Sequence, residues 1–531
     1  MRGHPNGWPF VYPHASIKEL MPSGRFTHEQ HRSAPYSEAL ETHAARSPLM
    51  FMVPSHSGTH EGITEDLAAF AGERAIEMDI PQLVDGIDNG VDTPFDQAEA
   101  LAADAWGAQR CWFLANGSSQ GNRMAIVAAA GLGVGATIVA QRSAHSSLLD
   151  GLILSGLMPR FIDPSIDQSL GINHGLTPEQ LSAEITAAEE SGDRVCAAYV
   201  ISPSYFGAVA DIRGLSEVAH AHGIPLIVDA AWGAHFGFHP RLPAFPTAQG
   251  ADMVVTSTHK MGGSLSQSAM LHLSEGPFAE KLEPLLERAH RLTQTTSASS
   301  LLLGSLDIAR RALMTREDLI ERSINLATQL SDWLRAHPTL SLASDSFRSF
   351  EDIVEVDPLR VSVDVSALGI TGYEVRSRLA QEFGIFVEIA TIRVVVAFFG
   401  PGKDLDTARL QTALDTIVES APRPEAGRTD TAVRDMLQLP QPGERRMSPR
   451  DAYFAPSEVV SFEHAVGRVS TDSLAAYPPG IPNVTPGETI RQDLIDFLRS
   501  VAASPIGYVR GALDASVSAF RVVKDPLGDP E

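Results

Sequence analysis

The sequence predicts an α/β protein whose central sheet is mainly parallel and covered by helices on both faces. Short apolar runs recur between residues 50 and 300, Ala-rich helical stretches separate them, and polar motifs follow several of the runs. Buried parallel strands are apolar along their whole length and are connected through helices. The runs that we interpret as strands are 111–115, 137–140, 159–162, 195–201, 225–228, 253–255 and 269–273.

The pattern of helices, strands and Pro/Gly-rich stretches divides the chain into five segments. The arm contains one predicted helix at 37–45, and a long helical stretch at 305–336 opens the smaller domain. Strand, helix and strand follow at 359–365, 373–383 and 393–399. The predicted segments are an N-terminal arm (1–50), a large domain (51–304), a smaller α/β domain (305–421), a linker with one short helix (422–446) and a C-terminal α+β domain (447–531).

Composition excludes several classes of protein. The 531 residues are 44% apolar, enough for several cores, and carry a net charge of -24, which disfavours a nucleic-acid partner. No apolar run of about 18 residues occurs and residues 1–13 lack signal-peptide order, so we expect a cytoplasmic protein without membrane contact. Cys111 and Cys196 lack CxxC spacing and no histidine pair shows HExxH spacing, so we expect neither disulfides nor a metal site.

Two polar motifs follow neighbouring apolar runs. Asp229 begins Asp-Ala-Ala-Trp (229–232), and Lys260 ends Ser-Thr-His-Lys (257–260). Only five of the 41 basic residues are lysines, so Lys260 stands out. The motifs are one strand–helix–strand unit apart, and both can face one crevice at the carboxyl edge of the sheet. Taken singly, Asp229 would be a strand-end cap and Lys260 a solvated charge.

A carboxylate and a lysine in one crevice suit pyridoxal 5'-phosphate (PLP). The lysine amine forms a Schiff base with the aldehyde, and the carboxylate keeps the pyridine nitrogen protonated. The turn Gly117-Ser118-Ser119 before a helix can bind the phosphate, although such a turn is often a simple N-cap. Further candidate contacts are His145, which can stack on the ring or be an ordinary loop histidine, and Ser257 and His259, which flank the lysine.

The order of these motifs resembles the ornithine/lysine/arginine decarboxylase family, PLP-dependent enzymes of fold type I. The resemblance covers about residues 35 to 510. It rests on 53–58, 116–119, His145, 229–232, 257–260 with Ser266-Gln267, 294–297 with 305–307, 467–469 and 477–488. It implies decarboxylation of lysine, arginine or ornithine, with an unnamed acidic residue receiving the distal cation of the substrate.

The resemblance also implies roles for individual residues. Lys260, Asp229 and His145 would be catalytic, and Lys260 would protonate the carbon that loses CO₂, with His145 and His259 as alternatives. The residues implied to contact the cofactor are Lys260, Asp229, His145, Gly117, Ser118, Ser119, Ser257, His259, Trp232, Ala231 and Thr296. Thr296 belongs to a segment that can reach a partner's cofactor, so we expect a homo-oligomer, at least a dimer with shared sites.

Departures from the family pattern leave alternatives open. Ser57 and Ser146 stand where the family has lysines, and about 50 residues precede Pro54, so we do not expect a decamer built on an N-terminal wing domain. An aminotransferase or another PLP reaction is the main alternative, for which Arg393 is a possible carboxylate-binding residue, although a structural strand role is favoured. An alternative of another class is a non-catalytic PLP-fold protein that regulates or binds a partner.

Overall fold

A seven-stranded sheet lies at the centre of the computed structural model, which describes residues 26–82, 84–133, 136–422, 439–477, 480–504 and 507–524. The strands are ordered β1-β10-β9-β8-β6-β2-β3, and only β10 runs antiparallel to its neighbours. The predicted mainly parallel sheet is therefore confirmed. Its strands are β1 (Arg110–Leu114), β2 (Thr137–Gln141), β3 (Met158–Ile162), β6 (Val195–Ile201), β8 (Leu226–Asp229), β9 (Met253–Thr256) and β10 (Ala269–Leu273).

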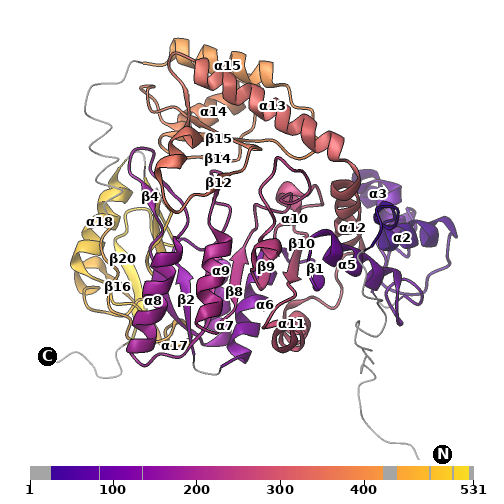
Figure 1. The fold of residues 1–531 in the computed structure, drawn as a ribbon, viewed down its shortest axis with the longest axis horizontal. Coiled ribbons are helices and arrows are strands. Elements are labelled where there is room, and N and C mark those ends of the chain that lie inside the picture. Colours follow the sequence, from indigo (N-terminus) through magenta and orange to yellow (C-terminus); the bar gives the residue numbers. More distant parts are fainter. Residues whose placement is uncertain are drawn as a thin grey trace, which may run out of the picture.

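Helices cover both faces of this sheet (Figure 1). Helices α5 (Pro94–Ala105), α8 (Pro178–Glu190) and α9 (Ile212–Ala221) lie on one face, and α6 (Gly117–Gly131), α7 (Ser146–Ser155) and α11 (Ala279–Thr293) on the other. In β8, Leu226 and Val228 pack toward the first set and Ile227 toward the second. Because strand side chains alternate, Asp229 at the end of β8 faces α6 and α7.

The arm docks on α12 (Ser300–Thr315) through α2 (Pro35–Ala45), which confirms the predicted helix in the arm. Asp307 accepts a hydrogen bond from the Tyr36 N–H at 3.0 Å, and Arg310 donates to the carbonyls of His31 and Ser33. The remaining elements of this region are η1 (Gln30–Arg32), η2 (Gly62–Thr64), α3 (Glu65–Ala71) and α4 (Glu73–Met78). The described part of the arm is thus fixed through backbone groups.

The helical stretch predicted for 305–336 consists of two helices, α12 and α13 (Glu317–Ala336). Arg316 between them leaves the helical conformation, with φ -125° and ψ 50°. Glu317 and Asp318 fall in the first turn of α13, where acidic side chains are favoured. The break lets α12 pack on the arm while α13 packs on the smaller domain.

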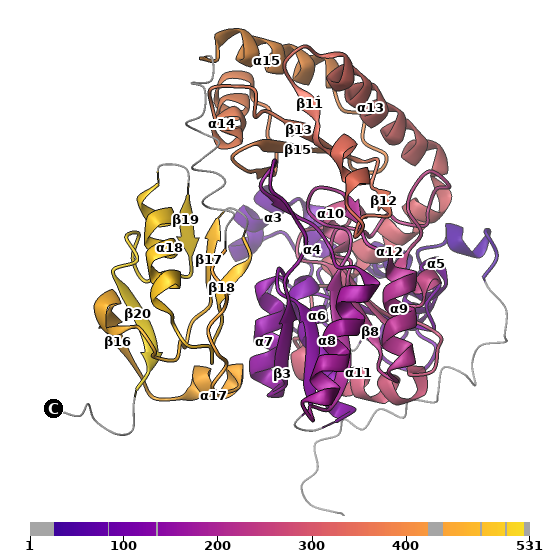
Figure 2. The same ribbon diagram turned by 60° about the vertical axis from the view of Figure 1, so that its left-hand side comes forward.

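The smaller domain is a four-stranded antiparallel sheet ordered β11-β13-β15-β14, with α13, α14 and α15 beside it (Figures 1 and 2). The predicted strand, helix and strand are found as β13, α14 and β15. A strand pair, β12 with β7, joins this domain to the large one. The bounds are β7 (Ala208–Val209), β11 (Ser341–Leu342), β12 (Glu355–Val356), β13 (Arg360–Asp364), β14 (Ile389–Ala390), β15 (Val394–Phe398), α14 (Gly372–Phe383) and α15 (Thr407–Ser420).

The C-terminal domain contains two small antiparallel sheets, β16-β20 and β18-β17-β19, and lies beside α7, against which α17 packs (Figure 2). The short helix predicted for the linker lies outside the described residues. The elements are α17 (Pro449–Phe454), β16 (Ser457–Ser461), η5 (Phe462–His464), β17 (Leu474–Tyr477), β18 (Pro482–Val484), α18 (Gln492–Ala503), β19 (Tyr508–Arg510) and β20 (Ala519–Val523). Short elements elsewhere are β4 (Ile166–Asp167), β5 (Ile172–Asn173), η3 (Pro246–Gln249), α10 (Thr258–Met261) and η4 (Ala343–Ser349).

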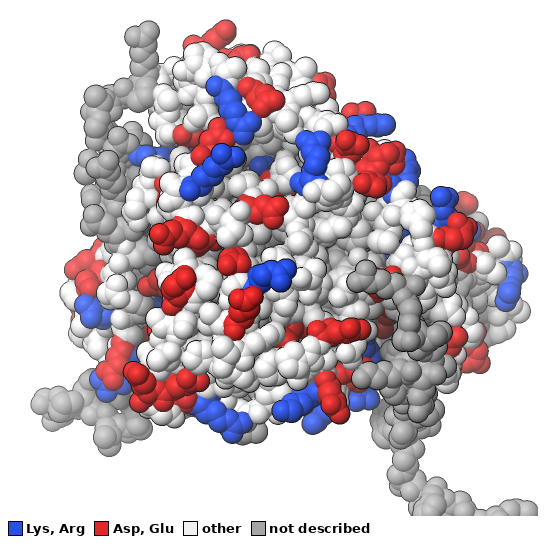
Figure 3. Space-filling model, viewed as in Figure 1, with Lys and Arg blue, Asp and Glu red and all other residues white. Residues whose placement is uncertain are grey.

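The surface carries acidic and basic side chains side by side. On the face shown in Figure 3 they are interspersed, with no broad basic stripe. Both cysteines are buried and unpaired. Among the described residues, no helix combines the length and the apolar character needed to cross a bilayer.

Candidate active site

The fold brings Asp229 and Lys260 to the same edge of the sheet. Strands β8 and β9 are parallel neighbours, with Asp229 paired to Val255, and Lys260 lies in α10 just after β9. Burial lowers the pKa of Lys260, the Asp229 carboxylate opposes that change, and the Arg360 guanidinium adds to it. A lysine amine with a lowered pKa is a better nucleophile, because more of it is unprotonated near neutral pH.

Asp229 is buried and accepts three hydrogen bonds. Its Oδ2 accepts from the Asn122 amide and from the Tyr199 hydroxyl, each at 2.9 Å, and its Oδ1 accepts from the Ala231 N–H at 3.0 Å. Donors of this kind stabilise the ionised carboxylate. Only one of these donors reaches Oδ1, so that oxygen can accept a further hydrogen bond from a ligand.

The Trp232 ring packs against the amine of Lys260. The Lys260 Nζ lies 4.3 Å from the centroid of the Trp232 ring, and that ring stacks on Phe398 at 4.9 Å. The Arg360 guanidinium contacts both rings and donates to the carbonyls of Trp232 and Ser204. The Trp232 Nε1 is buried without a hydrogen-bond partner among the described residues. A buried indole donor with no acceptor is available to a bound molecule.

Two serines from separate segments meet at the start of α6. The Ser257 hydroxyl donates to the Ser118 Oγ at 2.7 Å, and Gly117 begins the helix with φ 72°. Ser119 lies in the same first turn. A helix N-terminus with adjacent hydroxyls offers several donors to an anion such as a phosphate. The sequence-predicted turn and Ser257 are thus brought together.

Both predicted histidines flank this site. His145 is the N-cap of α7, and its Nδ1 lies 2.9 Å from the Ser147 Oγ. His259 has its Nδ1 2.8 Å from the Ser268 carbonyl oxygen, to which it donates. Burial lowers the pKa of each imidazole. The charges of Asp229 and Lys260 both act on the pKa of His145, Asp229 raising it and Lys260 lowering it.

Most of the sequence matches known decarboxylases. Residues 34–407 match the family model for the major domain of Orn/Lys/Arg decarboxylases, and residues 432–505 match the model for their C-terminal domain. An arginine decarboxylase of Bacillus subtilis (strain 168) is 34% identical over 502 residues, which cover 93% of this chain and 99% of that protein. The chain belongs to the Orn/Lys/Arg decarboxylase family.

Solved structures of this fold agree with that assignment. Lysine decarboxylase A from Pseudomonas aeruginosa has a TM-score of 0.78 at 20% identity and covers 94% of this chain and 81% of its own. The constitutive lysine decarboxylase of Escherichia coli has a TM-score of 0.75 at 20% identity, covering 93% and 82%. The fold predicted from the resemblance is therefore confirmed, and the chain is an enzyme of the decarboxylase family.

Some predicted residues of this decarboxylase are not brought to the site. Thr296 is exposed in the segment between α11 and α12, so its action on a partner's cofactor stays a prediction. Arg393 donates to the Ser169 carbonyl, in keeping with the structural role favoured for it. Ser146 is exposed at the first position of α7.

Sequence reasoning missed several side chains of the site. Asn122 lies one helical turn after Ser118, a spacing that could have indicated a shared face. Ser147 stands two residues after His145, which is the spacing of an N-cap contact. No local pattern pointed to Tyr199 or Arg360.

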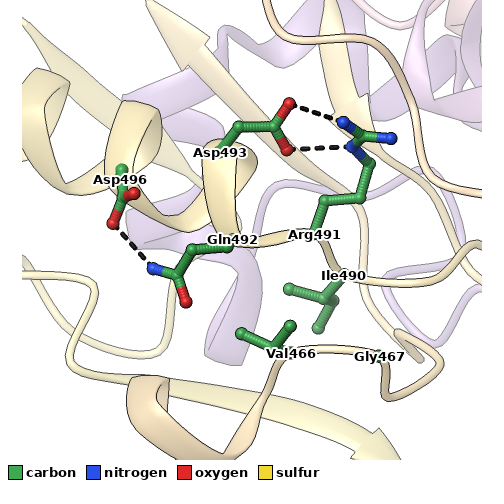
Figure 4. Close-up of a pocket in the computed structure, with 7 residues that line it drawn as sticks. All are labelled: Val466, Gly467, Ile490, Arg491, Gln492, Asp493 and Asp496. Carbon is green, nitrogen blue, oxygen red and sulfur yellow. Dashed lines mark hydrogen bonds and ion pairs between the residues drawn. The ribbon is translucent and has the colours of Figure 1, made fainter.

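A cavity away from this site lies in the C-terminal domain. It has a volume of about 610 Å³ and is lined by residues around the start of α18 (Figure 4). Its polar side chains are paired with each other: Arg491 with Asp493 at 2.9 Å, and Gln492 with Asp496 at 2.8 Å. Since these groups already satisfy one another, this cavity offers little to a polar ligand.

Proposed function

We propose that this decarboxylase uses PLP to release the α-carboxyl group of a basic L-amino acid as CO₂. The observation that carries the proposal is the meeting of the Lys260 amine, the buried Asp229 carboxylate and the Ser118–Ser257 hydroxyl pair at one sheet edge. The groups fit PLP: the hydroxyl pair suits its phosphate, Asp229 Oδ1 its ring nitrogen, and Lys260 its aldehyde. The unpartnered Trp232 Nε1 is a further donor.

Bound PLP supplies an electron sink for the bond next to the substrate amine. The side chains of the protein bind the cofactor and transfer protons. The Asp229 carboxylate, held by three donors, would keep the proton on the ring nitrogen. The Lys260 Nζ, with its lowered pKa, takes a proton from the substrate ammonium and moves protons at the reacting carbon. Ser118 and Ser257 would hold the phosphate end and so restrict the motion of the bound group.

The arginines of the smaller domain favour decarboxylation over amino transfer. A guanidinium that clamps the α-carboxylate would stabilise its negative charge, which that group must lose when CO₂ leaves as a neutral molecule. Arg360 is fully buried and donates to the Trp232 and Ser204 carbonyls, and Arg393 donates to Ser169. Both guanidinium groups are thus engaged with backbone oxygens.

Glu388 is the acidic residue that we assign to the distal cation of the substrate. It precedes β14, and its negative charge raises the pKa of Lys260 against the larger effect of burial, so its carboxylate acts electrostatically on that amine. A carboxylate from another domain whose charge reaches the amine is a candidate partner for the guanidinium or ammonium of a substrate. Because relatives at 33% to 34% identity are named arginine decarboxylases, we propose arginine as the first substrate to test.

The test follows CO₂ and amine formation by the purified protein with PLP and each of L-arginine, L-lysine and L-ornithine, without a keto acid. Lys260→Ala should abolish turnover and the colour of the bound cofactor, whereas Lys281→Ala, on the exposed face of α11, should retain both. Glu388→Gln should raise KM more than it lowers kcat. Amino transfer that requires a keto acid, or colour without turnover of any basic amino acid, would refute the proposal.

We also propose a homodimer. Large apolar side chains are exposed near the N-terminal end of the large domain, including Phe51 (92%), Ile63 (96%) and Phe70 (90%). Exposed apolar clusters of this kind mark interaction surfaces. Sedimentation equilibrium should give twice the mass of the chain, and Phe51→Glu should shift the species toward monomer. A monomeric wild type at micromolar concentration would contradict this assembly.

A further inference from the structure

A chain of hydrogen bonds, part-buried at His145 and buried from Ser147 onward, links His145 to Asp229. The His145 Nδ1 lies 2.9 Å from the Ser147 Oγ, the Asn122 Nδ2 lies 2.9 Å from the same oxygen, and that Nδ2 lies 2.9 Å from the Asp229 Oδ2. Asn122 is 1% exposed and Ser147 is fully buried. Asn122 on α6 and Ser147 on α7 therefore connect two groups of the active site through the protein interior.

The direction of each hydrogen bond follows from the carboxylate. Ionised Asp229 can only accept, so Asn122 must present its amide N–H to it, and the second N–H of the same nitrogen is donated to the Ser147 Oγ. The Ser147 backbone N–H points at the His145 Nδ1 at 3.3 Å, which makes that nitrogen an acceptor. The Ser147 hydroxyl hydrogen is therefore directed to the same Nδ1, 2.9 Å away, while the hydroxyl oxygen accepts from Asn122. Two donors therefore converge on one ring nitrogen.

We infer that Asn122 and Ser147 are positioning residues that hold His145 as the neutral tautomer with its proton on Nε2. Nδ1 receives two hydrogen bonds and has no room for a proton of its own. Protonating it would require the Ser147 hydroxyl and the helix N–H to turn away. The ring proton of His145 is therefore on Nε2, which is a donor.

This tautomer decides which group moves the proton in the decarboxylation, and that step of the inference rests on the proposed function. A neutral imidazole with Nδ1 occupied is a poor acid, so the transfer to the reacting carbon falls to the Lys260 Nζ. His259 is held in the opposite tautomer, since its Nδ1 donates to the Ser268 carbonyl. His145 and His259 were the alternatives to Lys260 as proton donor to the reacting carbon. A hydrogen bond at Nδ1 thus fixes the tautomer of each histidine.

The charges around His145 act in both directions. Burial lowers its pKa most strongly, Asp229 and Asp150 favour the imidazolium, and Lys260 and Arg510 oppose it. The hydrogen-bond chain adds to burial, because it stabilises only the uncharged ring. The neutral form should therefore persist below the ordinary imidazole pKa of 6.5.

The test is ¹⁵N NMR of histidine-labelled protein, with and without PLP, from pH 5.5 to 8. His145 is assigned by its loss in His145→Gln. The expected result is an unprotonated Nδ1 and a protonated Nε2 for His145, and the reverse for His259. A proton on Nδ1 of His145, or a charged ring at pH 7, would overturn the inference in the wild type itself.

Two variants separate positioning from general folding effects. Ser147→Ala removes the hydroxyl donor, so the titration midpoint of His145 should move upward and the Nδ1 resonance should show partial protonation. Ser146→Ala, at the exposed neighbouring position, should leave both unchanged. If the tautomer is as inferred but no basic amino acid is decarboxylated, the proposed function fails and the hydrogen-bond chain stands. If a basic amino acid is decarboxylated while His145 carries its proton on Nδ1, the inference fails and the proposed function stands.

Discussion

The attachment of the C-terminal domain should depend on Glu488, and Glu488→Gln is the perturbation that tests this. Its carboxylate accepts from Arg142 at 2.8 and 3.0 Å and from Arg445 at 2.9 Å. Arg142 follows β2 of the large domain, and it and Glu488 are each 4% exposed at the side chain. Glutamine would leave two buried guanidinium groups without their shared anion.

The expected loss follows from this burial. Removing one partner of a buried ion pair costs about 3–5 kcal/mol, because the remaining charge stays desolvated. The matched control is Asp493→Asn, which breaks the Arg491 pair on the surface of the same domain, where the side chains are 51% and 47% exposed. An exposed pair contributes about 0–1 kcal/mol. The two variants should therefore differ by about 2 kcal/mol or more.

Acid should mimic the Glu488 substitution. Burial opposes ionisation, yet Arg142 and Arg445 hold the pKa of Glu488 below its usual 4.5. A depressed pKa in the folded state contributes stability above pH 4.5, and that contribution is lost as the pH falls through the lower, folded-state pKa.

Hydrogen exchange at β18 and calorimetry are the measurements for both effects. The domain need not unfold with the rest, so a separate transition should move in Glu488→Gln. Equal shifts in Glu488→Gln and Asp493→Asn would refute the reasoning.

Three further outcomes are expected. Gly121→Ala should destabilise the protein by about 1–3 kcal/mol in urea titrations, since its new Cβ would lie 2.6 Å from Val255; unchanged stability would contradict the tight packing of α6 on the sheet. Asp229→Asn should lower kcat on the order of 10²- to 10³-fold in CO₂ release assays, as when a charge-stabilising group is removed; a kcat near wild type would exclude its assigned role. Arg393→Gln should leave kcat/KM unchanged, because its guanidinium holds the Ser169 carbonyl; a large loss would instead support a carboxylate-binding role.

The large domain could be predicted because its signals are local. The run 225–228 is apolar throughout, as expected of a strand buried on both faces, and Asp229 ends it. Such a pattern fixes both the strand and the edge where its polar neighbour lies. The break within the helical stretch at 305–336 was not predicted. It lies at Arg316 and lets the two helices pack on different partners that are distant in sequence.

Site residues that belong to a sequence motif were predicted, and those that reach the site through long-range contacts were missed. Asp229, Lys260, Ser118 and Ser257 each follow a strand or open a helix, so their meeting follows from topology. Tyr199 reaches Asp229 only because β6 lies beside β8 and alternates in phase with it.

The smaller domain contributes side chains that contact Trp232 and charges that act on the pKa of Lys260. Arg360 and Phe398 hold Trp232 from that domain, Arg360 by a hydrogen bond to its carbonyl and Phe398 by stacking on its ring. The Arg360 cation also lowers the pKa of Lys260, while Glu388 raises it. If the smaller domain moved away, Trp232 would lose both supports and the amine would lose both charges. The pKa of Lys260, the proposed nucleophile, is therefore set in part by the packing of two domains.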